Sequence, residues 1–251
     1  MGPNFYKEVY YTNNGNAAEE LREALSNYKL IHYKGVPDTV DYKEYYGALV
    51  DQIGEVLHVD EDITTGNERS QERWTDVRYD KNNDFTFRHA NTRQPLHTDA
   101  AYTNFDQDIN FLICMECAEI GGATTFIDSA DLIAILEKYE PELLNRLRTT
   151  EVSFGKGDNQ RKLRRIIETD SNGTKLTWNY YRVMPDNKPE VLALCEDFHK
   201  FLETRIVAGG LQEAVILKKG ETAFFHDDRM LHGRNAFYGN RNLLKGGFNM
   251  R

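Results

Sequence analysis

Three residues carry the chemistry that the sequence suggests first. His97 and Asp99 are two positions apart, and His232 lies far downstream in a Leu-His-Gly context. Side chains two positions apart on a strand point to the same face, so His97 and Asp99 can be directed at one point. Two histidines and one carboxylate hold a metal ion on one side and leave its other positions open, as in non-haem Fe(II) oxygenases. We therefore expect a mononuclear metal site at these three residues.

A second His-x-Asp pattern competes with the first one. His226-Asp227-Asp228 has the same spacing, but it ends only a few residues before His232. We therefore interpret it as the loop that leads into this ligand. Asp227 and Asp228 then support the ligands, face the substrate, or are simply solvated.

Two further positions have the chemistry to bind an anion. Arg241 begins an otherwise apolar stretch, and it shares one strand face with Leu243, Lys245 and Gly247 by the period of two. An inward arginine needs an anionic partner, because an unpaired buried charge is costly, and its planar guanidinium matches a carboxylate. Lys245 on the same face is either a second anion anchor or a surface residue whose ammonium group reaches solvent, and we favour the latter. The Gly-Gly-Ala-Thr-Thr sequence at 121–125 is either a plain turn or a site where a threonine hydroxyl binds a carboxylate.

Other polar residues are weaker candidates. Cys114 and Cys117 resemble a redox or zinc pair, but a spacing of three predicts opposite faces of a strand, so we interpret them as core cysteines. Part of the polar loop upstream of His97 is either a substrate contact or ordinary loop polarity. The candidate substrate contacts are Arg88, Asn91, Arg93, Tyr102 and Asp228.

The composition limits the possible functions. A chain of 251 residues forms one large domain or two small ones, and its 40% hydrophobic content indicates a globular protein. A net charge of -9 argues against a dedicated nucleic-acid partner. The sequence has no apolar run of about 18 residues, so we expect no membrane partner, and its N-terminus lacks the apolar core of a signal peptide. Three cysteines are typical of reduced thiols, so we expect a cytoplasmic protein. Nothing indicates the oligomeric state.

Hydrophobic periodicity predicts many short strands with helices between them. Helices are expected at 14–28, 42–53, from Ser129, from Pro141, and at 189–206. Strands are expected at 29–33, 109–117, 123–127, 214–217, 222–225 and 242–248, with loops and short strands over 60–95. Asp170-Ser171-Asn172-Gly173 is typical of a hairpin turn between arms at 164–168 and 175–179. The pattern favours an α+β fold, mainly β, of the barrel or jelly-roll kind with helical decoration.

The motifs together resemble one enzyme family. Leu-His-Thr-Asp-x-x-Tyr at 96–102, Gly-Gly-x-Thr at 121–124 and Arg-x-Leu-His-Gly-Arg-x-Ala-Phe at 229–237 occur in this order, and Arg241 follows. This wording resembles the iron(II)/2-oxoglutarate dioxygenases of the taurine dioxygenase-like (TauD/TfdA) superfamily, and most closely its γ-butyrobetaine hydroxylase-like branch. The resemblance covers residues 85–251, and three ordered motifs make it more specific than any one of them.

The resemblance implies a fold and a set of site residues. It implies a double-stranded β-helix (jelly-roll, cupin-like) core with flanking helices. The chain would be a single catalytic domain, 1–251, with a variable part at 1–85, a core at 85–251 and a helical insert around 129–206. Iron would be held by His97, Asp99 and His232, and 2-oxoglutarate by Thr124 and Arg241.

The implied reaction uses O2 and 2-oxoglutarate as cosubstrates and releases succinate and CO2. We expect hydroxylation of an unactivated C–H bond in a small polar metabolite, such as an amino acid or a derivative. Desaturation or cyclisation is compatible with the same ligands, whereas the carboxylate at Asp99 argues against chlorination. Two other classes stay open: a cupin-like binding protein without catalysis, and a zinc-dependent hydrolase or isomerase.

Overall fold

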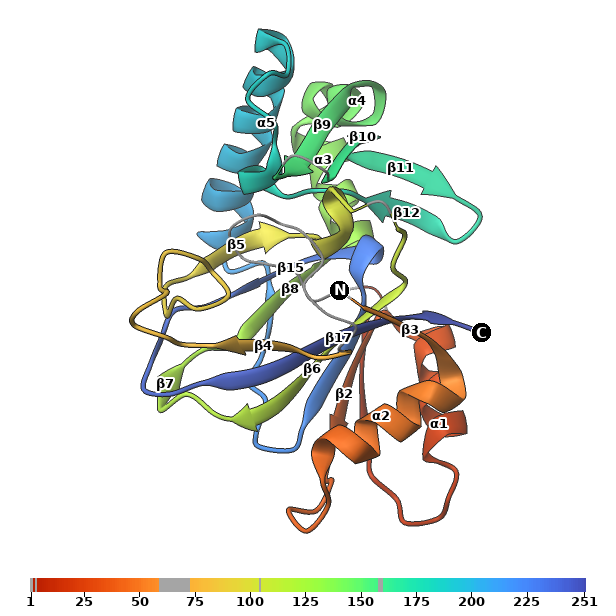
Figure 1. Ribbon diagram of the computed structural model, residues 1–251. Helices are drawn as coiled ribbons and strands as arrows, with labels where there is room; N and C mark the ends of the chain where they lie inside the picture. Colours follow the sequence, from red (N-terminus) through yellow and green to blue (C-terminus); the bar gives the residue numbers. More distant parts are fainter. Residues whose placement is uncertain (1, 3, 59–72, 104, 158–159) are drawn as a thin grey trace.

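The computed structural model describes residues 2, 4–58, 73–103, 105–157 and 160–251. This part of the chain is a mixed α/β structure, mainly strands, with five α-helices (Figure 1). Two sheets pack face to face, helices α1 and α2 cover the outer face of the larger sheet, and a helical insert covers the outer face of the smaller one. None of the helices in these ranges is long and apolar enough to cross a membrane.

The larger sheet combines both ends of the chain. Its strand order is β1-β2-β14-β6-β17-β3, and β4 also pairs with β17. The strands are β1 (Tyr6–Tyr10), β2 (Leu30–Lys34), β3 (Gly54–Leu57), β4 (Thr75–Arg78), β6 (Ile109–Glu116), β14 (Thr222–His226) and β17 (Asn242–Met250). Residues 1–85, expected to be a variable part outside the core, therefore supply four strands of this sheet.

Helices α1 (Ala17–Asn27) and α2 (Tyr42–Ile53) lie on the outer face of this sheet (Figure 1). Helix α1 buries Leu21, Ala24 and Leu25, as its apolar spacing predicts. Helix α2 begins where Asp41 accepts a hydrogen bond from the backbone amide of Glu44, at 3.0 Å.

The smaller sheet has the order β13-β8-β15-β5. Its strands are β5 (Gln94–His97), β8 (Thr124–Asp128), β13 (Glu213–Val215) and β15 (Met230–Arg234). Every residue of β8 and β15 is buried, because one face meets the larger sheet and the other meets the insert. The rings of Phe126 and Phe225, one from each sheet, have centroids 5.2 Å apart.

The insert leaves the smaller sheet after β8 and returns at β13. Its elements are α3 (Ser129–Tyr139), α4 (Pro141–Thr149), β9 (Glu151–Lys156), β10 (Gln160–Arg165), β11 (Ile167–Asp170), β12 (Gly173–Leu176), the 3₁₀ turn η2 (Tyr180–Arg182), α5 (Pro189–Phe201) and the π-helical turn η3 (Leu202–Val207). Its core centres on Trp178, whose ring contacts those of Phe154 and Phe198. The remaining elements are β7 (Ile120–Gly121), β16 (Phe237–Tyr238), and the 3₁₀ turns η1 (Asp99–Ala101) and η4 (Asp227–Arg229).

Most of the predicted elements lie where the periodicity places them, and the hairpin and the last helix differ in part. The strands β1, β3, β9 and β15 were not predicted. The hairpin at 170–173 is present as β11 and β12, but the predicted first arm was wrong at Arg164. Arg164 belongs to β10, which pairs with β9 instead. The predicted helix over 189–206 changes to π-helical geometry at Leu202. Of the polar stretch 60–95, residues 73–95 contain β4 and the start of β5, and residues 60–72 lie outside the described ranges.

Candidate metal centre and cofactor pocket

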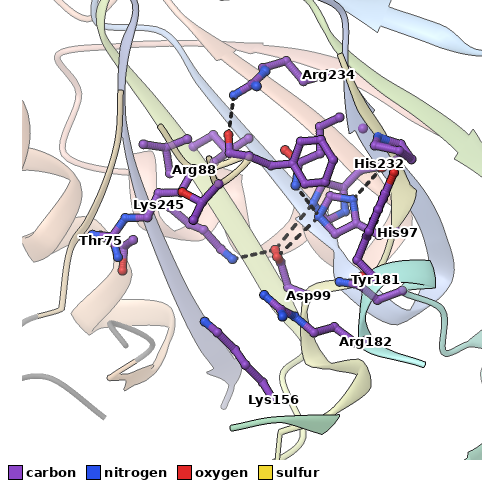
Figure 2. A pocket seen from close by; sticks show the side chains of 18 of the residues that line it. Thr75, Arg88, His97, Asp99, Lys156, Tyr181, Arg182, His232, Arg234 and Lys245 are labelled. Carbon is purple, nitrogen blue, oxygen red and sulfur yellow. Dashed lines mark hydrogen bonds and ion pairs between the residues drawn. The ribbon is translucent and has the colours of Figure 1, made fainter. Parts of the chain in front are cut away.

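The structure brings His97, Asp99 and His232 together (Figure 2). His97 ends β5 and lies opposite His232 on β15, and one ligand atom from each of the three residues falls within 4.8 Å of the others. The Nε2 atoms of His97 and His232 lie 3.7 and 3.5 Å from the carboxylate oxygens of Asp99. Asp99 reaches this point from the 3₁₀ turn η1. The three residues therefore meet as predicted, but the prediction that Asp99 shares a strand face with His97 was wrong.

Both imidazoles present Nε2 to the centre of the triad. Nδ1 of His97 lies 2.9 Å from the backbone oxygen of Pro95 and donates to it, so Nε2 is the nitrogen that faces the centre of the triad. Burial, followed by the neighbouring His97, lowers the pKa of His232 to about 4, so this ring is neutral at pH 7. Neutral imidazoles and an ionised carboxylate are the donors that a divalent first-row metal requires.

The carboxylate of Asp99 is surrounded by donors. Lys245 Nζ lies 2.7 Å from its Oδ2, and Asn110 Nδ2 donates to the same oxygen at 2.7 Å. Burial alone would raise the pKa of Asp99, but Lys245 and then His232 hold it well below its usual range. The interpretation of Lys245 as a solvent-directed surface residue was therefore wrong, because its ammonium group points to Asp99 (Figure 2).

A second buried carboxylate supports the turn that carries Asp99. Asp227, which is 1% exposed, accepts hydrogen bonds from the backbone amides of Asp99 and Ala100, at 3.0 to 3.1 Å. Asn110 Nδ2 donates to the same carboxylate at 2.9 Å. Burial and the charge of Asp99 raise the pKa of Asp227 to about 7. Of the alternatives that the sequence left open for Asp227, the structure shows the one in which it supports a ligand.

The competing pattern at 226–228 does not form a ligand set. His226 Nε2 lies 2.9 Å from the backbone oxygen of Leu25, and His226 is therefore turned away from the triad. Asp228 forms ion pairs with Lys175 and Arg229, each at 3.3 Å.

The insert fixes the metal loop from the other side. Thr98, between His97 of β5 and Asp99 of η1, is buried and bonds to the backbone of Trp178. The backbone amide of Thr98 donates to the carbonyl of Trp178 at 2.6 Å, and the Trp178 amide donates to Thr98 Oγ1 at 3.1 Å. The loop therefore has little freedom between β15, η4 and the insert.

A cavity of about 1020 Å³ opens beside the triad. Both anion-binding candidates, Thr124 and Arg241, line it, and Leu243 and Lys245 line it with Arg241 as the period of two predicts. Thr125 does not line it, and its hydroxyl accepts from Gln212 at 3.5 Å. The Gly-Gly-Ala-Thr-Thr segment is thus a turn that positions Thr124 in the cavity wall.

Arg241 is a buried cation, 7% exposed. Burial lowers its pKa to about 10, although the nearby thiols raise it slightly. Arg241 therefore remains charged at pH 7. Within the described ranges its guanidinium has no carboxylate in ion-pair contact, and its nearest aromatic neighbour is the Phe237 ring, 5.6 Å away. The neighbouring Arg234 differs, because it donates to the backbone oxygens of Phe87, Ala90 and Thr92. Arg234 therefore fixes a loop, whereas Arg241 is available to an anion in the cavity.

The candidate substrate residues divide into two groups. Arg88 and Tyr102 line the cavity. Asn91, Arg93 and Asp228 are not among the described residues that line it, and Arg93 forms an ion pair with Glu203 of the insert.

Sequence reasoning missed two cations supplied by the insert, Lys156 at the end of β9 and Arg182 in η2. Both line the cavity, and Figure 2 labels them among its lining residues. The guanidinium of Arg182 lies 5.3 Å from the ring centroid of Tyr102. The bridge between Phe154 and Val183 and the hydrogen bond from the Met184 amide to the Ser153 oxygen bring these insert segments together, and no local pattern signals that pairing.

Two histidines and one carboxylate at the edge of a β-sheet, open to a cavity, define a mononuclear metal site of the non-haem iron oxygenase class. The model of the family described as "Taurine catabolism dioxygenase TauD, TfdA family" matches residues 5–247, and the chain belongs to this family. The match begins far upstream of residue 85, where the resemblance in the sequence motifs began. No curated protein matches the chain in sequence.

Solved structures share the fold at low sequence identity. The PvcB protein from Pseudomonas aeruginosa is 17% identical, with a TM-score of 0.68 over 98% of this chain and 87% of that one. A putative alpha-ketoglutarate-dependent taurine dioxygenase from Burkholderia xenovorans is 12% identical, with a TM-score of 0.69 over 100% and 88%. A variant of the non-heme iron oxygenase OrfP, in complex with (3S)-hydroxy-L-Arg, is 15% identical, with a TM-score of 0.64 over 94% and 80%. Family membership and the His-Asp-His triad make the protein a 2-oxoglutarate-dependent non-haem iron dioxygenase that uses Fe(II), 2-oxoglutarate and O2.

Proposed function

We propose that His97, Asp99 and His232 hold the Fe(II) ion and that Thr124 and Arg241 bind the distal carboxylate of 2-oxoglutarate. One observation carries this assignment: a buried arginine without an ion-pair partner in the described ranges lines the same cavity as the triad. A dicarboxylate that reaches from the metal to Arg241 would neutralise this buried charge. The hydroxyl of Thr124 would supply one further hydrogen bond.

Bound iron and 2-oxoglutarate supply the oxidising chemistry, in which O2 is consumed, succinate and CO2 are released, and a C–H bond is oxidised. The chain's own contribution is orientation. Asn110 and Asp227 hold the Asp99 turn, and the hydrogen bond from His97 to Pro95 fixes the direction of the ring.

We infer that the two packed sheets are the double-stranded β-helix core of a single catalytic domain. Pairing of β2 with β14, and of β3 and β4 with β17, supports this, because the N-terminal strands belong to the same sheet as the C-terminal ones. Membership of the γ-butyrobetaine hydroxylase-like branch and a cytoplasmic location stay predictions.

We further infer that the primary substrate is a small polar metabolite that carries an acidic group. The protein has a net charge of -9, yet the described cavity wall contains more cations than carboxylates. The cations are Arg88, Lys156, Arg182, Arg234, Arg241 and Lys245, and the carboxylates are Asp84 and Asp99. Arg234, Arg241 and Lys245 already have roles, and Arg88 donates to the backbone oxygen of Asp76 at 2.7 Å, so Arg182 in η2 is the cation that we assign to the substrate. An amino acid or a derivative fits this charge, and hydroxylation is the expected outcome.

The test of the assignment is an anaerobic titration of the metal-free protein with Fe(II) and then 2-oxoglutarate, followed by visible absorbance. Chelation of the iron by the 2-oxo acid is expected to give a weak charge-transfer band, which His97→Ala abolishes. Arg161→Ala is the control, because Arg161 pairs with Asp186 outside the cavity. A folded, iron-loaded protein without the band and without 2-oxoglutarate affinity would contradict the proposal and favour a cupin-like binding protein. Turnover with zinc in the absence of O2 would favour a hydrolase or isomerase.

A further inference from the structure

The two thiols of Cys114 and Cys117 are in contact. Their Sγ atoms lie 3.6 Å apart, and Cys114 is buried whereas Cys117 is exposed. The prediction that they occupy opposite faces of a strand was wrong, because β6 contains a bulge between them. Asn242 pairs with Glu116 and the next residue, Leu243, pairs with Cys114, so Met115 is an extra residue that interrupts the alternation.

The thiol pair borders the proposed 2-oxoglutarate site. A small cleft beside the main cavity is lined by both cysteines and also by Thr124 and Arg241. The cleft and the main cavity thus share the two residues assigned to the distal carboxylate. Arg241 and both cysteines thus form parts of one cleft wall, so a change in the thiol pair alters the surroundings of Arg241.

We propose that Cys114 and Cys117 form a redox-modification site in which a peroxide converts the two thiols into a disulfide that weakens 2-oxoglutarate binding. The exposed Cys117 sulfur attacks one peroxide oxygen, the O–O bond breaks, and Cys117 becomes a sulfenic acid with release of water. The Cys114 sulfur then displaces the sulfenic hydroxyl group, forms the S–S bond and gives its proton to a second water. Two electrons leave the two sulfurs and reduce one peroxide to two waters.

The order of the two steps follows from exposure. Burial raises the pKa of the Cys114 thiol, so this sulfur stays protonated and is shielded from the oxidant. Cys117 reaches solvent and is therefore the residue that is oxidised first. Cys195 is buried in the insert, remote from both, and serves as an internal control.

A disulfide requires movement at this end of β6. The bonded S–S distance is about 2.05 Å, so the sulfurs must approach by roughly 1.5 Å from their contact distance. The bulge allows this more readily than a regular ladder, but the cleft wall at Arg241 moves with it. The effect on 2-oxoglutarate rests on the function proposed above, whereas formation of the disulfide does not.

The experiment treats the full-length protein, free of metal, with hydrogen peroxide and counts free thiols after denaturation. Three thiols are expected before treatment and one after it, because the chain has three cysteines and two are consumed. Cleavage after Glu116 separates the two cysteines in sequence, so the disulfide should appear as a pair of linked peptides that dithiothreitol releases. Cys117→Ser should prevent the link, and Cys195→Ser should not.

The same samples are then titrated with Fe(II) and 2-oxoglutarate. We expect about tenfold weaker 2-oxoglutarate binding in the oxidised protein, restored by dithiothreitol and absent in Cys117→Ser. Three free thiols after oxidation of the folded protein, or a link that involves Cys195, would overturn the site. Unchanged 2-oxoglutarate affinity in the linked protein would overturn its coupling to the cavity. If reduced protein binds no 2-oxoglutarate, the proposed function fails, and the thiol count and peptide map still decide the disulfide.

Discussion

Lys245 Nζ lies 2.7 Å from Oδ2 of Asp99, so the carboxylate that we propose as a metal ligand has a cation of the protein beside it. This lysine repels a divalent ion at close range. Lys245→Met should therefore bind Fe(II) about tenfold more tightly in anaerobic titration. At an effective dielectric constant of roughly 20, the repulsion between the lysine ammonium and a nearby divalent ion costs a few kcal/mol before screening by salt.

The chain offers a matched control for this change. Lys175 and Asp228 form an ion pair of similar exposure outside the cavity, with side chains 25% and 20% exposed, against 20% and 21% for Lys245 and Asp99. Lys175→Met should leave Fe(II) affinity unchanged. Weaker binding by Lys245→Met would instead mean that the lysine is needed to hold Asp99 in place.

Asp227→Asn tests the support of the Asp99 turn. The amide has one acceptor oxygen where the carboxylate accepts from two backbone amides and from Asn110. We expect a loss of about 1–3 kcal/mol in the free energy of unfolding and weaker metal binding. Chemical denaturation and Fe(II) titration measure the two effects, and unchanged metal affinity in a folded variant would contradict the supporting role.

The same residue predicts a pH dependence in the metal-free protein. Burial, followed by Asp99, raises the pKa of Asp227 in the folded state from 3.8 to about 7. The folded state then binds this proton more tightly than the unfolded state, so the stabilisation is complete below about pH 4 and is lost as pH rises through 7. His232 acts in the opposite direction, because burial lowers its pKa to about 4.

Comparison of two proteins isolates the contribution of Asp227. Both proteins are unfolded with urea between pH 5.5 and 8, and the wild type should lose stability relative to Asp227→Asn as the pH rises. The contribution of His232 is common to the two proteins, so it cancels in the difference. A constant difference between the two proteins over this range would show that Asp227 does not titrate there.

The Thr124 and Thr125 pair allows a conservative test of the cosubstrate site. Thr124 lines the cavity, whereas the hydroxyl of Thr125 accepts from Gln212. Thr124→Val should weaken 2-oxoglutarate binding by about fivefold to tenfold, the loss of roughly 1 kcal/mol for one hydrogen bond, without changing Fe(II) affinity. Thr125→Val should leave both affinities unchanged, and the reverse pattern would exclude Thr124 as a cosubstrate contact.

Arg182 tests the acidic group proposed for the substrate. The probes are amino acids, each compared with its primary amide and its decarboxylated amine, and turnover is followed as succinate release. We expect the acids to be preferred, and Arg182→Gln to raise KM for them at least tenfold while the 2-oxoglutarate affinity stays constant. Arg161→Gln, in the same insert but paired with Asp186, should change nothing. Equal turnover of acid, amide and amine would rule out the acidic substrate.

Sequence reasoning succeeded where short-range signals decide the outcome. Helix α2 has the predicted bounds, because its apolar spacing and the cap at Asp41 are local. The three candidate metal ligands meet in space, although Asp99 reaches them through a 3₁₀ turn. Lys245 could have been placed in the cavity, since the period of two that directed Arg241 inward applies equally to it.

Predictions from the sequence failed where a strand or side chain far away in the chain determines the local structure. Arg93 was a substrate candidate, but Glu203, 110 residues later, forms an ion pair with it. The contact of Cys114 with Cys117 depends on a bulge that only the register with β17 creates. The place of the N-terminal strands depends on β14 and β17, whose pairing no local pattern in residues 1–85 reveals.

The insert leaves the smaller sheet at Asp128, the last residue of β8, and returns at Glu213, the first residue of β13. These two strands are antiparallel neighbours in which Glu213 pairs with Phe126, so the departure and return points lie side by side. Elements inserted between adjacent points can be lengthened, shortened or exchanged without altering the path of the chain elsewhere. Because Lys156, Arg182 and Trp178 all belong to this segment, a graft of another insert onto the same two strands would transfer a substrate preference as one unit, provided that the graft keeps the hydrogen bonds between Trp178 and Thr98 that hold the loop of His97 and Asp99.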